Sequence, residues 1–288
     1  MFRKIRIFLE MIKIEHTLFA LPFAFMGAIL GSMLVNGMFP SWMQIFWVLL
    51  AMVGARSAAF GLNRIIDQTI DGKNPRTAMR AIPAGLLKNG EVIIFIIVSF
   101  VLLFWASSNL NVLSMQLLPI AVFMLVLYSY TKRFTWLCHI VLGMTIGLAP
   151  LGGWVAVTGS MDWTAIVLYV TIVFWTAGFD IIYACQDLEF DQGEGLHSIP
   201  SRFGLIKSLN IAKFFHIITA IGFLALLLMT DLSWWYGAGM LITYGILFYE
   251  HYIVSPNDMS RVQTAFFTMN SVLSLVVFTF TLIDLAVK

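Results

Sequence analysis

Three polar residues at a regular spacing follow the second long apolar run of the sequence. Asn63, Asp67 and Asp71 stand four residues apart. On a helix this spacing turns the side-chain direction by only about 40° per step, so all three share one face. Two carboxylates one turn apart repel each other unless a cation lies between them, and Mg²⁺ prefers such hard oxygen ligands together with substrate phosphates. The stretch therefore predicts a metal–phosphate site, in which Asn63 is a neutral ligand or orients one.

A second acidic set stands at the end of another apolar run, in the stretch DIIYACQDLEFD. Its members, Asp180, Asp187 and Asp191, are seven and four residues apart, so their directions on a helix differ by about 20° from one to the next. One Asp alone would be interpreted as a helix cap or part of a solvated loop. Two matched sets favour a functional cluster, and we expect a phosphate group held between them by Mg²⁺, as a pair of ions.

Basic residues cluster beside both acidic sets. A general role in membrane topology does not explain this clustering. A diphosphate, by contrast, carries more negative charge than a metal ion held by two carboxylates can neutralise, so it needs further cations. Arg also gives bidentate contacts to phosphate. We predict phosphate contact first for Arg76, then for Lys73, Arg80 and Lys132, and least for Arg133.

Two charged residues fall inside apolar segments, where an unpaired charge is costly. Arg56 either pairs with an acid on a neighbouring helix or contacts an anionic acceptor substrate. Asp180 either pairs with Arg56 or activates a hydroxyl of the acceptor. His139 and His197 are scattered and no Cys/His set is present, so a zinc site is not expected.

Composition places the chain in a membrane. Of its 288 residues, 60% are hydrophobic and only 11% are charged, far fewer than in a soluble domain, and the mean hydropathy is +0.91. The apolar runs are too closely spaced for a separate soluble domain. Residues 1–16 predict a basic amphipathic helix at the membrane surface rather than a signal peptide, because no small-residue cleavage site stands out. Cys138 and Cys185 are not expected to form a disulfide.

Nine membrane spans are predicted from the apolar runs. They cover approximately residues 17–35, 42–62, 92–108, 112–130, 136–157, 163–184, 209–230, 234–254 and 263–285. With the N-terminus inside, all but two of the 17 Lys and Arg residues, Arg56 and Lys288, lie in or beside inside segments, as the positive-inside rule requires. Both acidic sets follow even-numbered spans, so both are predicted to face the cytoplasm.

These motifs resemble those of the UbiA superfamily of intramembrane prenyltransferases. The first has the form NxxxDxxxD and continues as NPRTAMRAIPAG, and the second has the form YxxxDxxxD, beginning at Tyr183, and continues as GLHSIPSRFG. The opening KIEHTLFALPFAFMG and the segment YTKRF are also similar to the family. The resemblance covers nearly the whole chain. It implies an all-α integral membrane protein, with nine transmembrane helices around a central cavity capped on the cytoplasmic side, and a single domain over residues 1–288.

The resemblance also implies an activity and roles for residues. The family transfers a prenyl chain from a prenyl diphosphate to an aromatic or other lipophilic acceptor. Asn63, Tyr183 and Arg56 would contribute to substrate binding, Arg56 at the acceptor end of the cavity. The residues expected to hold Mg²⁺ and diphosphate are Asp67, Asp71, Asp187 and Asp191 with help from Asn63, and those expected to bind phosphate are Arg76, Arg80 and Lys132. Arg64 departs from the pattern, because many members have Asp there.

The motif contexts are most similar to bacterial 4-hydroxybenzoate polyprenyltransferases and to their naphthoate-acting relatives in the futalosine route to menaquinone. The acceptor is therefore expected to be 4-hydroxybenzoate or 1,4-dihydroxy-6-naphthoate, in the bacterial cytoplasmic membrane, without nucleic acid or an obligatory protein partner. A different class of protein, a cation-coupled transporter, would place its acids near the bilayer midplane. A third, a membrane protein that binds lipid phosphate without catalysis, would need no dry cavity.

Overall fold

The chain forms a bundle of long helices in the computed structural model, which describes residues 2–12 and 17–287. Helices make up all the regular secondary structure of the described residues, apart from one isolated bridge between Ser255 and Asp258. The α-helices are α1 (Phe2–Met11), α2 (Thr17–Gly31), α3 (Trp42–Ile66), α4 (Gln68–Lys73), α5 (Asn89–Ser108), α6 (Val112–Thr131), α7 (Cys138–Thr158), α8 (Trp163–Ala184), α9 (Leu188–Gly193), α10 (Ile199–Met229), α11 (Trp234–Tyr252) and α12 (Asn270–Val287).

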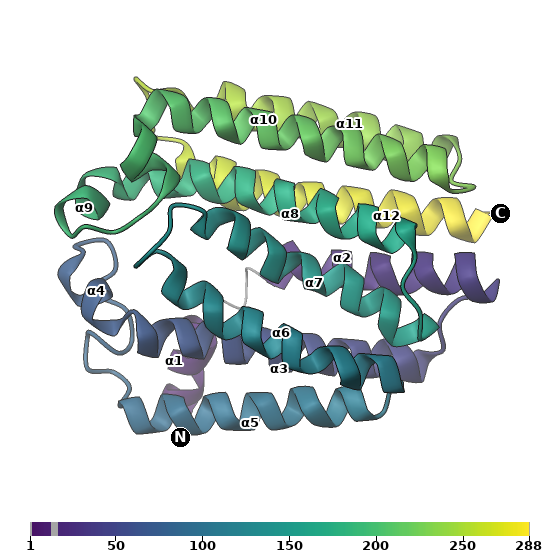
Figure 1. Cartoon of the computed structure of the whole chain (residues 1–288), viewed down its shortest axis with the longest axis horizontal. Helices are drawn as coiled ribbons and strands as arrows, with labels where there is room; N and C mark the ends of the chain where they lie inside the picture. The colour runs from purple at the N-terminus through teal and green to yellow at the C-terminus, as the bar shows by residue number, and fades with distance from the viewer. Residues whose placement is uncertain (1, 13–16, 288) are drawn as a thin grey trace.

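Eight of the described helical segments are long and apolar enough to cross a membrane. They coincide with eight of the predicted spans. The ninth prediction, 234–254, coincides with α11, which runs beside α10 (Figure 1) but is not one of the eight. The structure therefore supports a multi-pass membrane protein and leaves the count of nine a prediction.

The start of α10 differs from the prediction by ten residues. The helix begins at Ile199 instead of 209, because the Ser198 side chain accepts a hydrogen bond from the backbone N–H of Ser201 and caps it. The helix bends at Gly204, whose φ of +75° is a left-handed value that other residues rarely adopt. The capped first turn therefore lies at an angle to the rest of α10.

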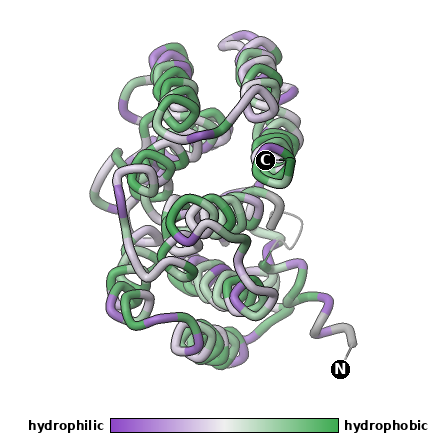
Figure 2. The backbone as a smooth tube through the Cα atoms, turned by 90° about the vertical axis from the view of Figure 1, so that its right-hand side faces the viewer, coloured by the Kyte–Doolittle hydropathy of each residue, from purple (hydrophilic) through white to green (hydrophobic). Residues whose placement is uncertain are grey.

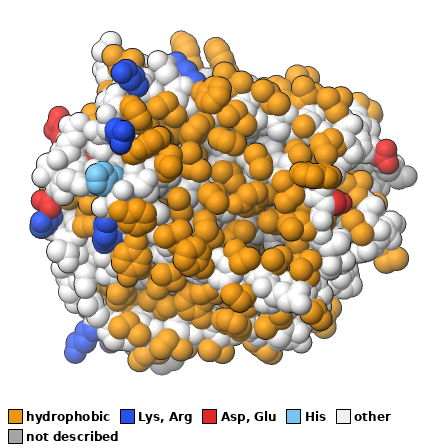
Figure 3. Space-filling model, viewed as in Figure 1, with side chains coloured by type: hydrophobic (Ala, Val, Ile, Leu, Met, Phe, Trp, Pro, Cys, Tyr) orange, Lys and Arg blue, Asp and Glu red, His pale blue; other side chains and the backbone are white. Residues whose placement is uncertain are grey.

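The long helices lie side by side, and α4 and α9 lie together at one end of the bundle (Figure 1). We call this the motif end, formed by residues 67–88 and 185–198. The C-terminus lies at the opposite end. Figure 2 looks along the helices from that opposite end, and Figure 3 shows an apolar surface across the middle, with the visible Lys and Arg side chains gathered toward the motif end.

The N-terminal segment is helical, as predicted, from Phe2 to Met11. Lys4 pairs with Glu91 at the start of α5, and Met11 is buried against the same helix. The last part of the predicted surface helix, residues 13–16, lies outside the described residues. The described part of the helix therefore rests on the motif-end half of α5.

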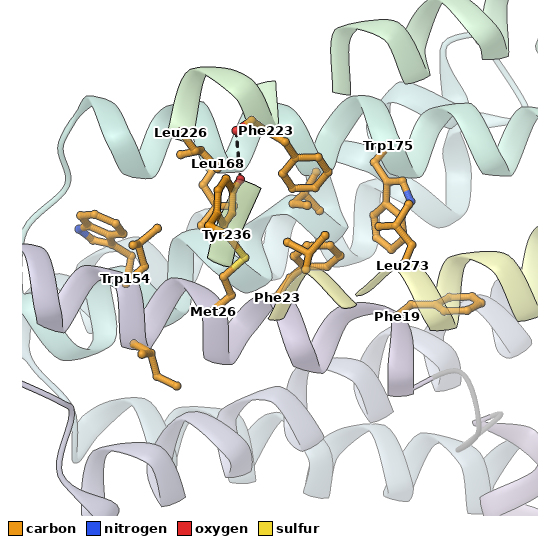
Figure 4. Close-up of a cluster of buried hydrophobic side chains, with 14 of the residues drawn as sticks. Phe19, Phe23, Met26, Trp154, Leu168, Trp175, Phe223, Leu226, Tyr236 and Leu273 are labelled. Atoms are coloured by element: carbon orange, nitrogen blue, oxygen red, sulfur yellow. Dashed lines mark hydrogen bonds between the residues drawn. The ribbon is translucent and has the colours of Figure 1, made fainter. Parts of the chain in front are cut away.

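Aromatic side chains form the largest buried cluster, where α2, α8, α10, α11 and α12 meet (Figure 4). Trp175 packs edge-on against both Phe23 and Phe179, with 4.9 Å between ring centroids in each pair. Its indole N–H donates to Asn270 Oδ1 at 2.7 Å, which satisfies the one polar atom of the ring. The cluster thus fixes α8 against α2 and α12 beneath the motif end.

Glycines allow α2, α7 and α8 to pack backbone against backbone, and α10 to pack closely on α8. An added Cβ would lie 2.0 to 2.2 Å from a backbone oxygen of the next helix at three of them, in the pairs Gly27–Pro150, Gly153–Ala24 and Gly143–Val173. A Cβ at Gly222 of α10 would lie 2.1 Å from the Thr171 hydroxyl oxygen of α8. No larger side chain fits at these four positions without moving a helix.

Candidate active site

The first acidic motif spans a break between two helices. α3 ends at Ile66, Asp67 adopts a non-helical conformation (φ −93°, ψ 3°), and α4 begins at Gln68. The prediction of one continuous helix is therefore wrong in this detail. The Asp67 N–H still donates to Asn63 O, and the Asp71 N–H to Asp67 O, so the four-residue spacing survives. Asp67 and Asp71 are buried, at 2% and 3% exposure.

The second acidic motif is also broken. Asp180 lies within α8, Asp187 ends a 3₁₀ turn (Cys185–Asp187), and Asp191 lies on the short α9. The turn tightens the chain where α8 leaves the bundle and carries Asp187 and Asp191 to the motif end. Asp180 remains seven residues deeper on α8.

Two cations and an amide hold the Asp67 carboxylate. Lys132 Nζ lies 2.7 Å from Oδ2, Arg133 Nη2 lies 2.9 Å from Oδ1, and Asn63 Nδ2 donates to Oδ2 at 2.8 Å. Arg133 also donates to the carbonyl of Ile66 at 2.7 Å. Arg133, which the sequence ranked last among the basic residues, thus contacts the first motif directly.

Two arginines face the Asp71 carboxylate. Arg80 Nη1 donates to both oxygens, at 2.7 and 2.8 Å. Arg64 Nη1 lies 3.8 Å from Oδ2 and donates to Asn63 Oδ1 at 3.2 Å. Arg64 is almost fully buried, so the residue that departs from the family pattern places a cation behind the motif where an Asp would have added an anion.

Arg76 joins the two motifs. Its Nε and Nη2 donate to the two oxygens of Asp187 at 2.9 and 2.5 Å, and its Nη1 donates to the Tyr183 hydroxyl at 2.7 Å. Asn74 Nδ2 donates to Asp187 as well, at 3.0 Å. Burial would lower the pKa of Arg76, but these hydrogen bonds raise it above its usual value. Residues from the loop after α4 therefore hold the second motif against the first.

The remaining groups at the motif end form weaker links. Asp191 accepts a hydrogen bond from the Ser198 hydroxyl at 2.9 Å. Lys73 Nζ lies 2.5 Å from Glu194 and is largely exposed. The backbone N–H of His197 donates to the Lys132 carbonyl at 2.7 Å. The loop after the second motif is thereby tied to the loop that carries the Asp67 partners.

The two charged residues predicted within spans do not pair with each other. Asp180 accepts from His139 Nδ1 at 2.7 Å, so its predicted pairing with Arg56 is wrong. Arg56 donates to the carbonyl of Ile12 at 3.2 Å, and its guanidinium lies 4.6 Å from the Phe60 ring centroid.

The donor set fits Mg²⁺ by its chemistry. Among the described residues, no three His, Cys, Asp or Glu side chains are grouped as a ready metal site. Mg²⁺ does not need such a cage, because it usually takes one or two carboxylates and completes its shell with water and substrate phosphates. The paired carboxylates and the Asn63 amide supply oxygen donors of this kind.

Sequence reasoning missed three members of the site. Asn74 and Ser198 follow the motifs within seven residues, and both bind a motif acid. His139 lies 41 residues from Asp180, and the sequence did not predict that the two would pair. An Asp inside an apolar span is costly without a partner, and this cost was the feature of the sequence that indicated a partner for Asp180.

Comparison with known sequences identifies the family. The sequence profile of the UbiA prenyltransferase family matches residues 20–272. A 4-hydroxybenzoate octaprenyltransferase of Aliivibrio salmonicida is 28% identical over 81% of both chains. The mitochondrial 4-hydroxybenzoate polyprenyltransferase of Arabidopsis thaliana is 37% identical over 67% of this chain and 47% of its own.

Solved structures share the fold. An apo UbiA homologue from Aeropyrum pernix K1 superposes with a TM-score of 0.84 at 27% identity, covering 94% of this chain and 98% of its own. A UbiA homologue from Archaeoglobus fulgidus, solved with DMAPP and Mg²⁺, superposes with a TM-score of 0.74 at 20% identity, over 98% and 99%. The chain belongs to the UbiA prenyltransferase family and is a multi-pass membrane enzyme that transfers prenyl groups.

Proposed function

We propose that this enzyme transfers a polyprenyl group from a polyprenyl diphosphate to an aromatic acceptor in a Mg²⁺-dependent reaction. The acceptor is 4-hydroxybenzoate or 1,4-dihydroxy-6-naphthoate, and the product serves ubiquinone or menaquinone synthesis. The names of the bacterial and plant relatives support the acceptor class. The observation that carries the proposal is the bidentate Arg76–Asp187 contact, which brings two acid motifs separated by more than a hundred residues to one site.

The diphosphate is the leaving group, and the motif end supplies its counter-charges. Arg76, Arg80 and Lys132 each hold a motif acid through donors that also suit phosphate oxygens. Lys73 and Arg133 lie at the same end. When bound, Mg²⁺ would neutralise the diphosphate as a Lewis acid and so favour breaking of the allylic C–O bond. Asp67, Asp71, Asp187 and Asp191, with Asn63, would hold it.

The two structures of the Archaeoglobus fulgidus homologue with DMAPP or GPP and Mg²⁺ support this assignment of substrate and metal. Their folds match this chain, and both ligands are allylic diphosphates. The basic residues of this chain therefore neutralise the departing diphosphate as the C–O bond breaks and electron-deficient carbon develops. The apolar bundle beneath the site excludes water, which would otherwise capture that carbon.

The enzyme has a defined position in the membrane under this proposal. Residues 1–288 form one prenyltransferase domain in a bacterial cytoplasmic membrane, with the N-terminus and the motif end on the cytoplasmic side. Arg56 contacts the carboxylate of the acceptor, and Tyr183 lies beside the substrate. The clustering of Lys and Arg at the motif end supports this orientation. The lipid bilayer supplies the prenyl substrate, and the function needs no nucleic acid or protein partner.

A cation-coupled transporter has less support. Four of the acids lie at helix ends with basic or hydroxyl partners, instead of lining a path at the bilayer midplane. The family is also one of enzymes.

Prenyl transfer in detergent or liposomes tests the proposal. The purified protein is incubated with Mg²⁺, a labelled polyprenyl diphosphate, and either 4-hydroxybenzoate or 1,4-dihydroxy-6-naphthoate in separate reactions. We expect a prenylated product with one acceptor, and loss of that product with EDTA or in Asp67→Ala. Folded protein that binds the diphosphate but prenylates neither acceptor would remove both acceptors from the proposal.

A further inference from the structure

One carboxylate lies deeper than the diphosphate site. Asp180 lies within α8, seven residues before Asp187, which ends the 3₁₀ turn after α8. Its side chain is 20% exposed, while its neighbours Phe179, Ile181 and Ile182 are at most 2% exposed. The carboxylate of Asp180 is therefore partly open to its surroundings, unlike the side chains beside it on α8.

The only hydrogen-bond partner of Asp180 among the described residues is His139. The contacts of its two ring nitrogens show which of them faces Asp180. His139 Nδ1 lies 2.7 Å from Asp180 Oδ2, and the backbone N–H of Ile199 points at His139 Nε2, 3.2 Å away. A backbone N–H can only donate, so Nε2 must carry a lone pair. Nδ1 is therefore the ring nitrogen that donates to Asp180.

This arrangement leaves Asp180 as a charged acceptor with spare capacity. The histidine occupies Oδ2, and no hydrogen bond from the described residues reaches Oδ1. The histidine therefore orients the carboxylate through one oxygen and leaves the other available. A carboxylate below the surface of a membrane protein gains from a further donor. Both proposed acceptors carry a ring hydroxyl, which donates one hydrogen bond.

We propose that His139 is a positioning residue that holds Asp180 to accept a hydrogen bond from the ring hydroxyl of the acceptor. The inference rests on the proposed function and extends it to recognition of the acceptor. A hydroxyl that donates to a carboxylate releases electron density into its ring, and the carbon ortho to it is the position that attacks the prenyl group. Asp180 thereby selects hydroxylated rings and orients them toward the diphosphate site.

Two variants at one position separate the bonds of His139. The amide of Asn reaches the position of Nδ1, so His139→Asn keeps a donor to Asp180. The amide of Gln reaches the position of Nε2, so His139→Gln keeps the contact with Ile199 and loses the donor to Asp180. We expect the KM for the hydroxylated acceptor to rise about tenfold in His139→Gln, equivalent to one charge-assisted hydrogen bond, and to stay within about threefold in His139→Asn. The KM for the prenyl diphosphate stays unchanged in both.

A competitor without the hydroxyl distinguishes recognition from a structural defect. If 4-hydroxybenzoate is the acceptor, benzoate is added as an inhibitor of prenyl transfer. If the dihydroxynaphthoate is the acceptor, 2-naphthoate, which lacks both hydroxyls, is added instead. The inhibition constant of the competitor should be the same in wild type and His139→Gln. An equal loss for competitor and acceptor, or an equal loss in the Asn and Gln variants, would overturn the role of His139. A wild-type enzyme that prenylates neither acceptor would overturn the proposed function itself.

Discussion

Asp67 holds two cations that the diphosphate needs. Lys132 and Arg133 both bind this buried carboxylate, so a diphosphate that arrives without Mg²⁺ must compete with Asp67 for them. Asp67 is one of the residues that would hold Mg²⁺, and a metal bound there would leave Lys132 and Arg133 available to the diphosphate. We therefore predict that Asp67→Asn binds a prenyl diphosphate more tightly than wild type when Mg²⁺ is absent, although it loses Mg²⁺-dependent transfer.

The size of the effect follows from the contacts. A hydrogen bond to a charged group contributes about 1.5–3 kcal/mol. The Lys132 and Arg133 side chains are 29% and 31% exposed, so solvent screening reduces each contribution to about half, and the Asn oxygen still accepts from one of them. The net gain is about 1.4 kcal/mol, which corresponds to about tenfold tighter binding.

Titration of a prenyl diphosphate into detergent-solubilised protein in EDTA measures this affinity. Glu189→Gln is the matched control, because it makes the same change of charge at an exposed position of α9 that has no ion pair with a described residue. It should leave the Mg²⁺-free affinity near that of wild type. Binding by Asp67→Asn that is no tighter than in this control would refute the exchange of partners.

Three further predictions concern the metal and the packing. EDTA should abolish prenyl transfer without lowering the melting temperature, because each of the four motif acids has a basic or hydroxyl partner within the protein; a large drop would contradict this. Gly153→Ala should destabilise the protein by about 1–3 kcal/mol, because its Cβ would lie 2.1 Å from the Ala24 oxygen, whereas Gly152→Ala, with open space, should melt like wild type. Asp284→Ala should lower stability by about 2–3 kcal/mol in chemical unfolding, because the buried Asp284 Oδ2 accepts from the N–H and hydroxyl of Ser233 at 2.8 and 2.6 Å; an unchanged midpoint would contradict it.

The sequence predicted the long helices well because the bilayer imposes their length and composition. α3, α6, α8 and α11 begin at the predicted residues. Of the motif acids, Asp67 directly follows α3, whereas Asp71 and Asp191 lie on the short helices α4 and α9 beyond the long ones. The start of α10 could not be predicted in this way, since Ser198 caps a polar first turn that lies outside the apolar run. Apolar length specifies what crosses the membrane and carries little information about turns beyond it.

The partners within the site depended on contacts between distant segments. Helical spacing correctly grouped Asp67 with Asp71, but it could not show that Lys132 and Arg133 approach from the loop after α6. It also could not show that His139, rather than Arg56, is the partner of Asp180. Such choices depend on which helices are neighbours, and the pattern within one helix does not encode them.

The glycine contacts have a consequence for the path of the lipid substrate. At Gly27, Gly153 and Gly143 the backbones of α2, α7 and α8 touch with no side chain between them, and at Gly222 α10 packs directly against the Thr171 side chain of α8. An isoprenoid chain is thicker than the gap at such a contact. These seams are closed to lateral diffusion from the bilayer, so a polyprenyl tail must enter through a part of the wall where side chains, which can rotate aside, separate the helices.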